Sequence, residues 1–131
     1  MMLDWIANRV GEQLKSQRLV LATAESCTGG WVAQAVTSVA GSSDWFDRGF
    51  VTYSNAAKRE MLGVRDETLA RHGAVSQETA REMAAGALAA SRAHVALAIT
   101  GIAGPAGGTP QKPVGTVCFA WARRGGATEA T

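Results

Sequence analysis

Apolar residues follow two patterns along this chain, and the two patterns alternate. In some segments they recur every three or four positions, as in an amphipathic helix, and in others they form the short continuous run of a strand buried on both faces. We expect helices at residues 3–17, 31–39, 55–62 and 76–92, and strands at residues 19–24, 48–54, 95–100 and 115–122. This alternation predicts a single layered α/β/α domain over residues 1–131 with a largely parallel central sheet, whose last strand is the candidate for an antiparallel one.

Three of the four predicted strands end in small or polar residues. The first is followed by ESCTGG at residues 25–30, the second by YSN at residues 53–55, and the third ends in Thr100-Gly101. Ligands of such sheets bind beyond the carboxyl ends of the strands. We therefore expect these three strand ends to converge on one site.

The composition constrains the packing and excludes one class of partner. Alanine accounts for 25 of the 131 residues, so the helices must pack closely. The net charge is only +2, and the lysines and arginines are scattered rather than clustered. The chain therefore lacks the electrostatic footprint of a nucleic-acid-binding protein.

Cysteine and histidine are too few for a metal centre or a disulfide framework. Cys27 and Cys118 lie 91 positions apart, and the chain has 2 histidines, so we expect no metal, no cofactor and reduced thiols. Asp4 and Arg9 interrupt the apolar core that a signal peptide would need, and no apolar run approaches the ~18 residues of a membrane span. The sequence thus favours a cytoplasmic protein without a membrane segment.

Ser26 is the first candidate nucleophile. It lies between the first predicted strand and a predicted helix, where unpaired N–H groups and the positive end of the helix dipole suit a reaction that creates an oxyanion. Thr28, Gly29 and Gly30 would line the same turn and let a substrate approach the backbone. The alternative is structural: Ser26 or Thr28 caps the helix, and the glycines allow tight packing.

Cys27 is a rival nucleophile, because a thiol at a helix N-terminus would have a lowered pKa. No histidine is placed to activate either residue. His72 lies in an apparent loop, and His94 precedes a strand at the end opposite the proposed site. Whichever of Ser26 and Cys27 is the nucleophile, its activation therefore requires another base.

Lys58 is the better candidate for that base. It lies one turn into the helix that follows the second strand, and partial burial would lower its pKa enough to let it accept a proton. Tyr53, at the end of the same strand, would relay the proton or orient the lysine. The alternatives are a solvated Lys58 and a Tyr53 that merely caps the sheet.

Four segments of the chain together resemble a known family. They are AESCTGG, TYSNAAKREMLGV, HGAVSQETAREMA and AITGIAGPAGGTPQKPVGTVCFA. In this order, between about Leu3 and Ala122, they resemble the C-terminal domain of CinA proteins. The resemblance implies hydrolysis of the carboxamide of nicotinamide mononucleotide to nicotinate mononucleotide and ammonia. It implies Ser26 as the nucleophile, Tyr53 and Lys58 completing a serine-lysine arrangement, and Thr100 in the site. In that mechanism, N–H groups from Cys27 to Gly30 would hold the oxyanion.

The resemblance also suggests a role for the loop between Gly101 and Gly115, where eight of fifteen positions are glycine or proline. Its glycines would aim N–H groups at the phosphate or ribose of a mononucleotide, assisted by Lys112. The candidates are Gly101, Gly104, Gly107 and Gly108. The alternative is a structural crossover stiffened by its prolines.

One departure from the family pattern concerns the end of the chain. Members continue with a basic segment that carries an active-site arginine and with a final helix, and Arg123 and Arg124 do not match that motif. Two alternatives follow: the sequence is part of a longer chain, or the domain lacks the final strand and helix segment. In the second case a non-catalytic nucleotide-binding or regulatory domain is the alternative function. Trp5 and Trp45 lie outside the best strand patterns, which suggests partial exposure and a homo-oligomer.

Overall fold

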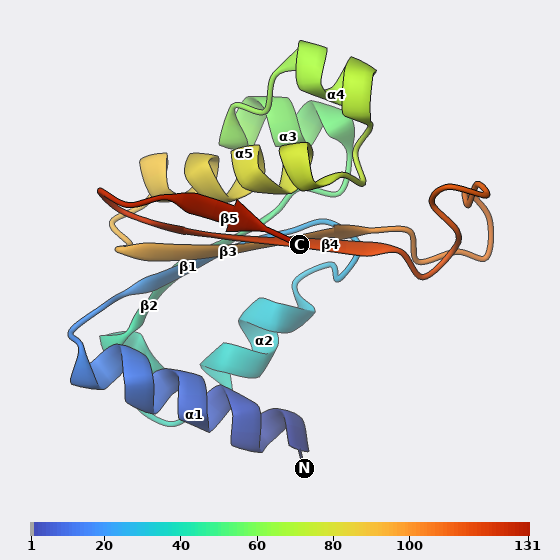
Figure 1. Ribbon diagram of the computed structural model, residues 1–131. Coiled ribbons are helices and arrows are strands. Elements are labelled where there is room, and N and C mark those ends of the chain that lie inside the picture. Colours follow the sequence, from blue (N-terminus) through green and yellow to red (C-terminus); the bar gives the residue numbers. More distant parts are fainter. Residues whose placement is uncertain (1) are drawn as a thin grey trace.

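A five-stranded sheet lies between two layers of helices in a computed structural model that describes residues 2–131 (Figure 1). The strands are β1 Leu21–Glu25, β2 Phe46–Val51, β3 Val95–Gly101, β4 Val117–Arg123 and β5 Thr128–Ala130. The α-helices are α1 Met2–Ser16, α2 Trp31–Thr37, α3 Asn55–Leu62, α4 Asp66–His72 and α5 Gln77–Ala89, and a short 3-10 helix spans Ser42–Asp44. The layered α/β architecture expected from the sequence is confirmed.

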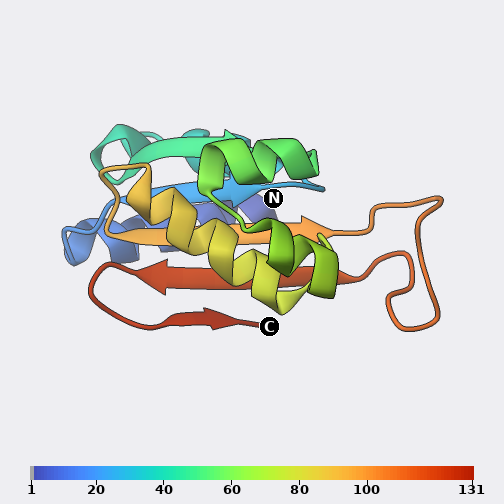
Figure 2. The same cartoon turned by 90° about the horizontal axis from the view of Figure 1, so that it is seen from above.

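The sheet has the order β2-β1-β3-β4-β5. β1 runs parallel to both β2 and β3, whereas β4 is antiparallel to β3 and β5 is antiparallel to β4. The antiparallel strand after the Gly/Pro-rich loop is therefore confirmed. The parallel strands place the ends of β1, β2 and β3 at one edge of the sheet (Figure 2).

Two elements, α4 and β5, were not predicted, nor was the 3-10 helix, and β2 spans Phe46–Val51 where residues 48–54 were expected. His72 does not lie in a loop but ends α4, a seven-residue helix with one buried residue, Thr68. Its N-terminal side is fixed from α5, where the Glu82 carboxylate accepts the N–H of Arg65 at 2.9 Å. β5 was not predicted, because three residues that pair only with β4 carry no pattern of their own.

The upper layer packs closely, as the alanine content predicts. Ala80, Ala84 and Ala87 of α5 are fully buried against the sheet. At Gly86 a Cβ atom would overlap the main chain of Leu62 in α3, so this crossing tolerates no side chain.

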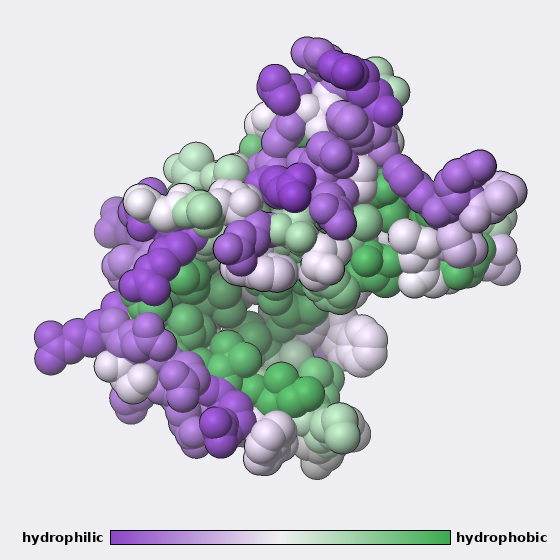
Figure 3. All heavy atoms as spheres, viewed as in Figure 1, coloured by the Kyte–Doolittle hydropathy of each residue, from purple (hydrophilic) through white to green (hydrophobic). Residues whose placement is uncertain are grey.

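The lower layer covers only part of its face of the sheet. α1 and α2 lie beneath β1 and β2, and Figure 3 shows apolar residues gathered in the hollow between α1 and the sheet. Trp45 is 3% exposed, so its expected exposure is wrong: its indole packs where a Cβ on Gly11 of α1 would come within 2.6 Å. Trp5 is exposed, as expected. Over residues 2–131, no helix has the length and apolarity needed to cross a membrane.

Candidate active site

The ends of β1, β2 and β3 converge, as predicted, on a cavity of about 240 Å³. Ser26 follows β1, Tyr53 follows β2 and Thr100 lies near the end of β3, and all three line this cavity together with Lys58 of α3. Cys27 and Gly101 complete the predicted residues at its wall. We call this space the Ser26 cavity.

Lys58 reaches the cavity from beneath the surface. The side chain is 1% exposed, and its Nζ lies 2.9 Å from Ser26 Oγ, 2.9 Å from the carbonyl oxygen of Thr52 and 3.0 Å from that of Tyr53. Burial lowers the pKa of Lys58 below its ordinary value, against a smaller opposing effect of Cys27. The alternative of a solvated lysine is therefore wrong.

The three oxygens around Nζ fit either protonation state of Lys58. As an ammonium it donates to Ser26 Oγ and to the carbonyls of Thr52 and Tyr53. An uncharged Lys58 has two N–H donors and one lone pair, so with both donors on the carbonyls its lone pair is left to accept the proton of the Ser26 hydroxyl. The contacts therefore place the Lys58 amine directly on the candidate nucleophile.

Tyr53 enters this network through its main chain. Its carbonyl oxygen accepts from Lys58 and lies 3.4 Å from Ser26 Oγ, whereas its side chain is 75% exposed. The phenol hydroxyl makes no hydrogen bond with any other residue of the described chain. Tyr53 therefore contacts Ser26 and Lys58 through its carbonyl, and its side chain is exposed.

Thr100 is a buried residue of the cavity wall. Its hydroxyl donates to the carbonyl of Ala74 at 2.9 Å, which holds the segment before α5 against the cavity. The sequence placed Thr100 in the site through the family resemblance, and the geometry gives it a contact that shapes the wall.

The turn between β1 and α2 takes a left-handed backbone at Gly29 and Gly30, with φ of 59° and 102°. L-residues with a side chain rarely adopt this conformation, which accounts for both glycines. The N–H of Gly29 donates to the Ser26 carbonyl at 3.1 Å, so this member of the expected oxyanion donors is already engaged. The hydroxyl of Thr28 points to Glu25, at 2.6 Å, and Thr28 does not line the Ser26 cavity.

Glu25 is a residue of this region that sequence reasoning missed. Its carboxylate accepts the N–H groups of Val32 and Ala33, both at 2.9 Å, in addition to the Thr28 hydroxyl. These N–H groups in the first turn of α2 therefore already have an acceptor within the protein, the Glu25 carboxylate. The signal in the sequence that could have identified Glu25 is an acidic residue at the end of an apolar strand.

Cys27 does not have the lowered pKa that its position suggested. Burial is the largest effect and raises the pKa of its thiol; a main-chain hydrogen bond lowers the pKa, the charge of Glu25 raises it, and the charge of Lys58 lowers it. A Cβ on Gly101 would lie 3.0 Å from Cys27 Sγ, so the thiol packs against β3. The expectation failed mainly because the thiol is partly buried, and the nearby Glu25 carboxylate adds to this effect.

The Gly/Pro-rich loop projects beyond the sheet (Figures 1 and 2), and no residue of 102–116 is buried. Gly104 and Gly107 have φ of 80° and 97°, and Gly108 packs against Val114. Together with Lys112, these three glycines do not line the Ser26 cavity.

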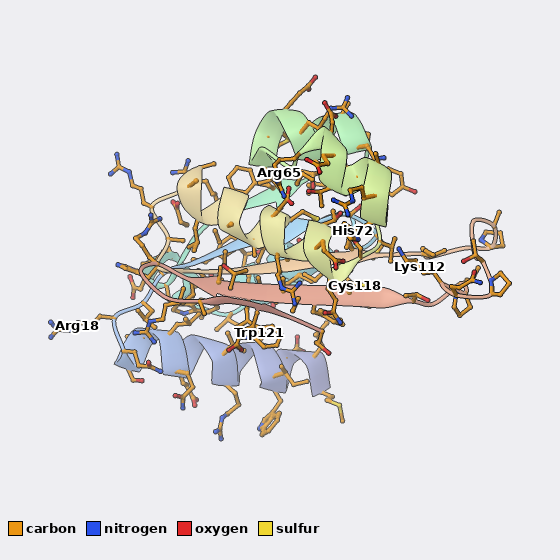
Figure 4. All side chains as sticks on the ribbon, turned by 45° about the horizontal axis from the view of Figure 1, so that its top comes forward. Arg18, Arg65, His72, Lys112, Cys118 and Trp121 are labelled. Carbon is orange, nitrogen blue, oxygen red and sulfur yellow. The ribbon has the colours of Figure 1, made fainter. Side chains whose placement is uncertain are left out.

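Lys112 joins the loop to α4. Its Nζ donates to the carbonyl of His72 at 2.7 Å, and the two residues lie together near Cys118 (Figure 4). They line a second cavity of about 370 Å³. Val75 lines both this cavity and the Ser26 cavity, so the two spaces are neighbours.

The remaining candidates have structural contacts. His94 Nδ1 accepts the N–H of Val20 at 2.9 Å, at the end of the sheet opposite the site. The Arg124 guanidinium donates to the carbonyls of Leu88 and Ala93, both at 2.7 Å, and within residues 2–131 no arginine lines the Ser26 cavity. The described chain also contains no group of three or more His, Cys, Asp or Glu side chains that could hold a metal ion.

Comparison with known proteins identifies the family. The model of the CinA C-terminal domain matches residues 3–131. This chain belongs to the CinA C-terminal domain family.

Several members of the CinA family are close relatives of this chain. It is 62% identical over 117 residues to the nicotinamide-nucleotide amidohydrolase PncC of Escherichia coli (strain K12), covering 89% of this chain and 71% of that protein. It is 60% identical over 114 residues to a CinA-like protein of Chloroherpeton thalassium, covering 87% of this chain but only 27% of that longer protein. The crystal structure of the competence/damage inducible protein CihA from Agrobacterium tumefaciens superposes with a TM-score of 0.95 at 53% identity, covering 98% of this chain and 78% of that one.

Proposed function

We propose that this chain hydrolyses the carboxamide of nicotinamide mononucleotide to nicotinate mononucleotide and ammonia. The observation that carries the proposal is the buried 2.9 Å contact between Lys58 Nζ and Ser26 Oγ at the wall of a cavity. The chain that holds this pair is 62% identical to a protein named nicotinamide-nucleotide amidohydrolase. A serine paired with a neutral lysine is suited to acyl transfer from an amide.

In the first half of the reaction Ser26 Oγ attacks the carboxamide carbon. A carbon–oxygen bond forms, the carbonyl electron pair moves onto oxygen, and the hydroxyl proton passes to Lys58 Nζ. The N–H groups of Cys27 and Thr28, next to Ser26 in the turn, are the proposed oxyanion donors. A well-placed donor of this kind contributes about 3 kcal/mol.

The tetrahedral intermediate then breaks its carbon–nitrogen bond. Lys58, now an ammonium, returns its proton to the leaving nitrogen, which departs as ammonia. Water attacks the acyl-enzyme carbon and gives a proton to Lys58, which passes it to Ser26 Oγ as the ester bond breaks. Nicotinate mononucleotide leaves and both residues return to their initial states.

The two neighbouring cavities suggest how a mononucleotide would lie. The pyridine carboxamide would occupy the Ser26 cavity, and the ribose and phosphate would extend past Val75 toward Lys112. A lysine ammonium is a suitable partner for a phosphate. Within the Gly/Pro-rich loop, this arrangement assigns binding roles to Gly101 and Lys112, whereas Gly104, Gly107 and Gly108 lie away from the Ser26 cavity.

Ammonia release from nicotinamide mononucleotide tests the proposal. Ser26→Ala is expected to lose turnover by about 10³-fold or more, because within residues 2–131 no other hydroxyl contacts Lys58 Nζ. Cys27→Ala is expected to keep turnover within about threefold. The reverse result would transfer the nucleophile to Cys27. No release by the wild type, together with thermal stabilisation by the nucleotide, would favour a binding domain over an enzyme.

Tyr53→Phe decides between direct proton transfer and a relay. The direct contact between Lys58 and Ser26 predicts that kcat changes by less than about threefold, since the main-chain carbonyl remains. A loss of about 10²-fold would restore the phenol hydroxyl to the proton path.

A further inference from the structure

Glu25 is a buried carboxylate that the proposed reaction does not use. It ends β1, a strand whose five residues are all buried, and it is 1% exposed. A carboxylate loses its hydration on burial, so it is tolerated only where protein donors replace the water. The source of these donors indicates what the residue does.

All three donors to the carboxylate lie beyond Ser26 in the chain. They are the Thr28 hydroxyl at 2.6 Å and the N–H groups of Val32 and Ala33 at 2.9 Å. Glu25 is therefore fixed in β1 at its main chain and bound to α2 at its side chain. The turn that carries Ser26, residues 26–30, is enclosed between these two attachments.

The main chain of Glu25 also supports the other half of the site. Its carbonyl accepts the N–H of Thr52 at 2.7 Å and lies 3.4 Å from the Thr52 hydroxyl. The carbonyl of Thr52 is in turn one of the acceptors around Lys58 Nζ. One residue thus contacts both the nucleophile turn and the segment that orients the base.

The capping of α2 differs from that of α3 and α5. Ser54 and Ser76 cap α3 and α5 locally, each accepting an N–H three residues further along. Gly30 precedes α2 without a side-chain cap, and the N–H groups of its first turn are bound by Glu25 from the far side of the turn. A local cap would satisfy the helix equally well. Because the Glu25 carboxylate binds α2 from the other end of residues 26–30, it also constrains the position of Ser26. Capping of the helix alone does not require this constraint.

We propose that Glu25 is a positioning residue that holds the turn of residues 26–30 so that Ser26 Oγ stays on Lys58 Nζ. Its effect on turnover rests on the proposed hydrolase function, whereas its effect on the turn rests on the contacts alone. A shift of about 1 Å in a reacting atom costs up to ~10²-fold in rate. Loss of this contact therefore lowers kcat and leaves KM nearly unchanged.

The same carboxylate has a second effect, on Cys27. Its negative charge disfavours a thiolate beside it, in the same direction as burial, while Lys58 acts in the opposite direction. Glu25 thus adds to the larger effect of burial in disfavouring the thiolate. This effect is measurable without any substrate.

Glu25→Gln is the main test, and Glu82→Gln is its matched control. Glutamine keeps the shape of Glu25, but its NH2 group must face one of the donors. Glu82 likewise accepts a main-chain N–H, that of Arg65, and a threonine hydroxyl, that of Thr68, but it does not line the Ser26 cavity. Both variants are expected to melt at a lower temperature.

Kinetics separate positioning from general stability. Glu25→Gln is expected to lower kcat about 10- to 100-fold with KM within about threefold, and Glu82→Gln to keep kcat within about twofold. Equal kcat values in the two folded variants would overturn the proposal.

Alkylation of Cys27 tests an effect of Glu25 without requiring that this chain hydrolyses nicotinamide mononucleotide. Its rate with iodoacetamide is followed against pH in a Cys118→Ser background. The midpoint is expected to fall in Glu25→Gln and to stay unchanged in Glu82→Gln. An unmoved midpoint in Glu25→Gln would overturn the effect of the carboxylate on Cys27, whether or not the wild type releases ammonia.

Thr28 provides a milder test if Glu25→Gln does not fold. Thr28→Val removes only the hydroxyl that donates to Glu25, and Thr28→Ser retains it. We expect Thr28→Val to lower kcat severalfold and Thr28→Ser to restore it. The same loss in both variants would contradict a role for this hydrogen bond.

Discussion

The Ser26–Lys58 pair and the Gly/Pro-rich loop, two regions to which the sequence assigns a role in the same site, are built in opposite ways. Ser26 and Lys58 are 6% and 1% exposed, and each has defined partners. The loop over residues 102–116 contains no buried residue and projects from the sheet (Figure 2). Bond making needs atoms held by packed neighbours, whereas an exposed loop suits the polar end of a substrate. We therefore expect changes in the pair to act on kcat and changes in the loop to act on KM.

Lys58→Met should have the largest effect. Methionine fills much of the same buried space but accepts no proton, so kcat is expected to fall about 10²- to 10⁴-fold. The control is Arg59→Met, which removes only an exposed ion pair to Asp66 and should leave kcat unchanged. Steady-state ammonia release measures both. A Lys58→Met variant that remains folded and active would remove the base from the proposed mechanism.

The pH profile of the wild type should show the same lysine. Because burial lowers the pKa of Lys58 below 10.5, the neutral form becomes available at a lower pH than for a free lysine. Turnover should rise about tenfold per pH unit below that pKa and level off above it.

The same shift affects stability. The unfolded chain binds more protons at Lys58 between the lowered pKa and 10.5, so the free energy of unfolding should also rise with pH across this window.

The pH profile of turnover can contradict this account. If the rise of kcat with pH has its midpoint at or above 10.5, burial does not lower the pKa of Lys58.

Lys112→Ala should have the smallest effect, and it should act on binding. Losing one charge-assisted contact to a phosphate is expected to raise KM about tenfold, with kcat within about twofold. Gln111→Ala, an exposed neighbour in the same loop, is the control and should change neither. If Lys112→Ala instead lowers kcat as strongly as Lys58→Met, the contrast between the two regions fails.

Much of the fold follows from local pattern. Each of the four predicted strands overlaps an observed strand, and α3 spans the residues expected for it, 55–62, because periodicity and turn chemistry act over a few residues. β5 and α4 were missed because both depend on partners elsewhere: β5 on β4, and the start of α4 on Glu82. Trp45 was misjudged for the same reason, since the glycine that makes room for it lies in α1.

Of the candidate site, too, one part could be predicted from local pattern and another depends on distant partners. Ser26 and Lys58 were accessible to chemical reasoning, because strand ends of a parallel sheet converge and a lysine near such an end is a candidate base. The state of the Cys27 thiol was not, because it depends on burial and on the charges that the fold brings next to it. Burial, together with a smaller effect of the Glu25 charge, raises the pKa of the thiol instead of lowering it.

The sequence by itself determined the alternation of helices and strands, the family and the pair of residues that carries the proposed chemistry. These depend on periodicity, on motifs and on the residue types at strand ends. Only the tertiary structure decided that Lys58 is buried on Ser26, that Tyr53 contributes its carbonyl there, and that most of the Gly/Pro-rich loop lies away from the Ser26 cavity. Burial and hydrogen-bond partners come from segments far apart in the chain. They determine the pKa of a lysine and the position of a loop.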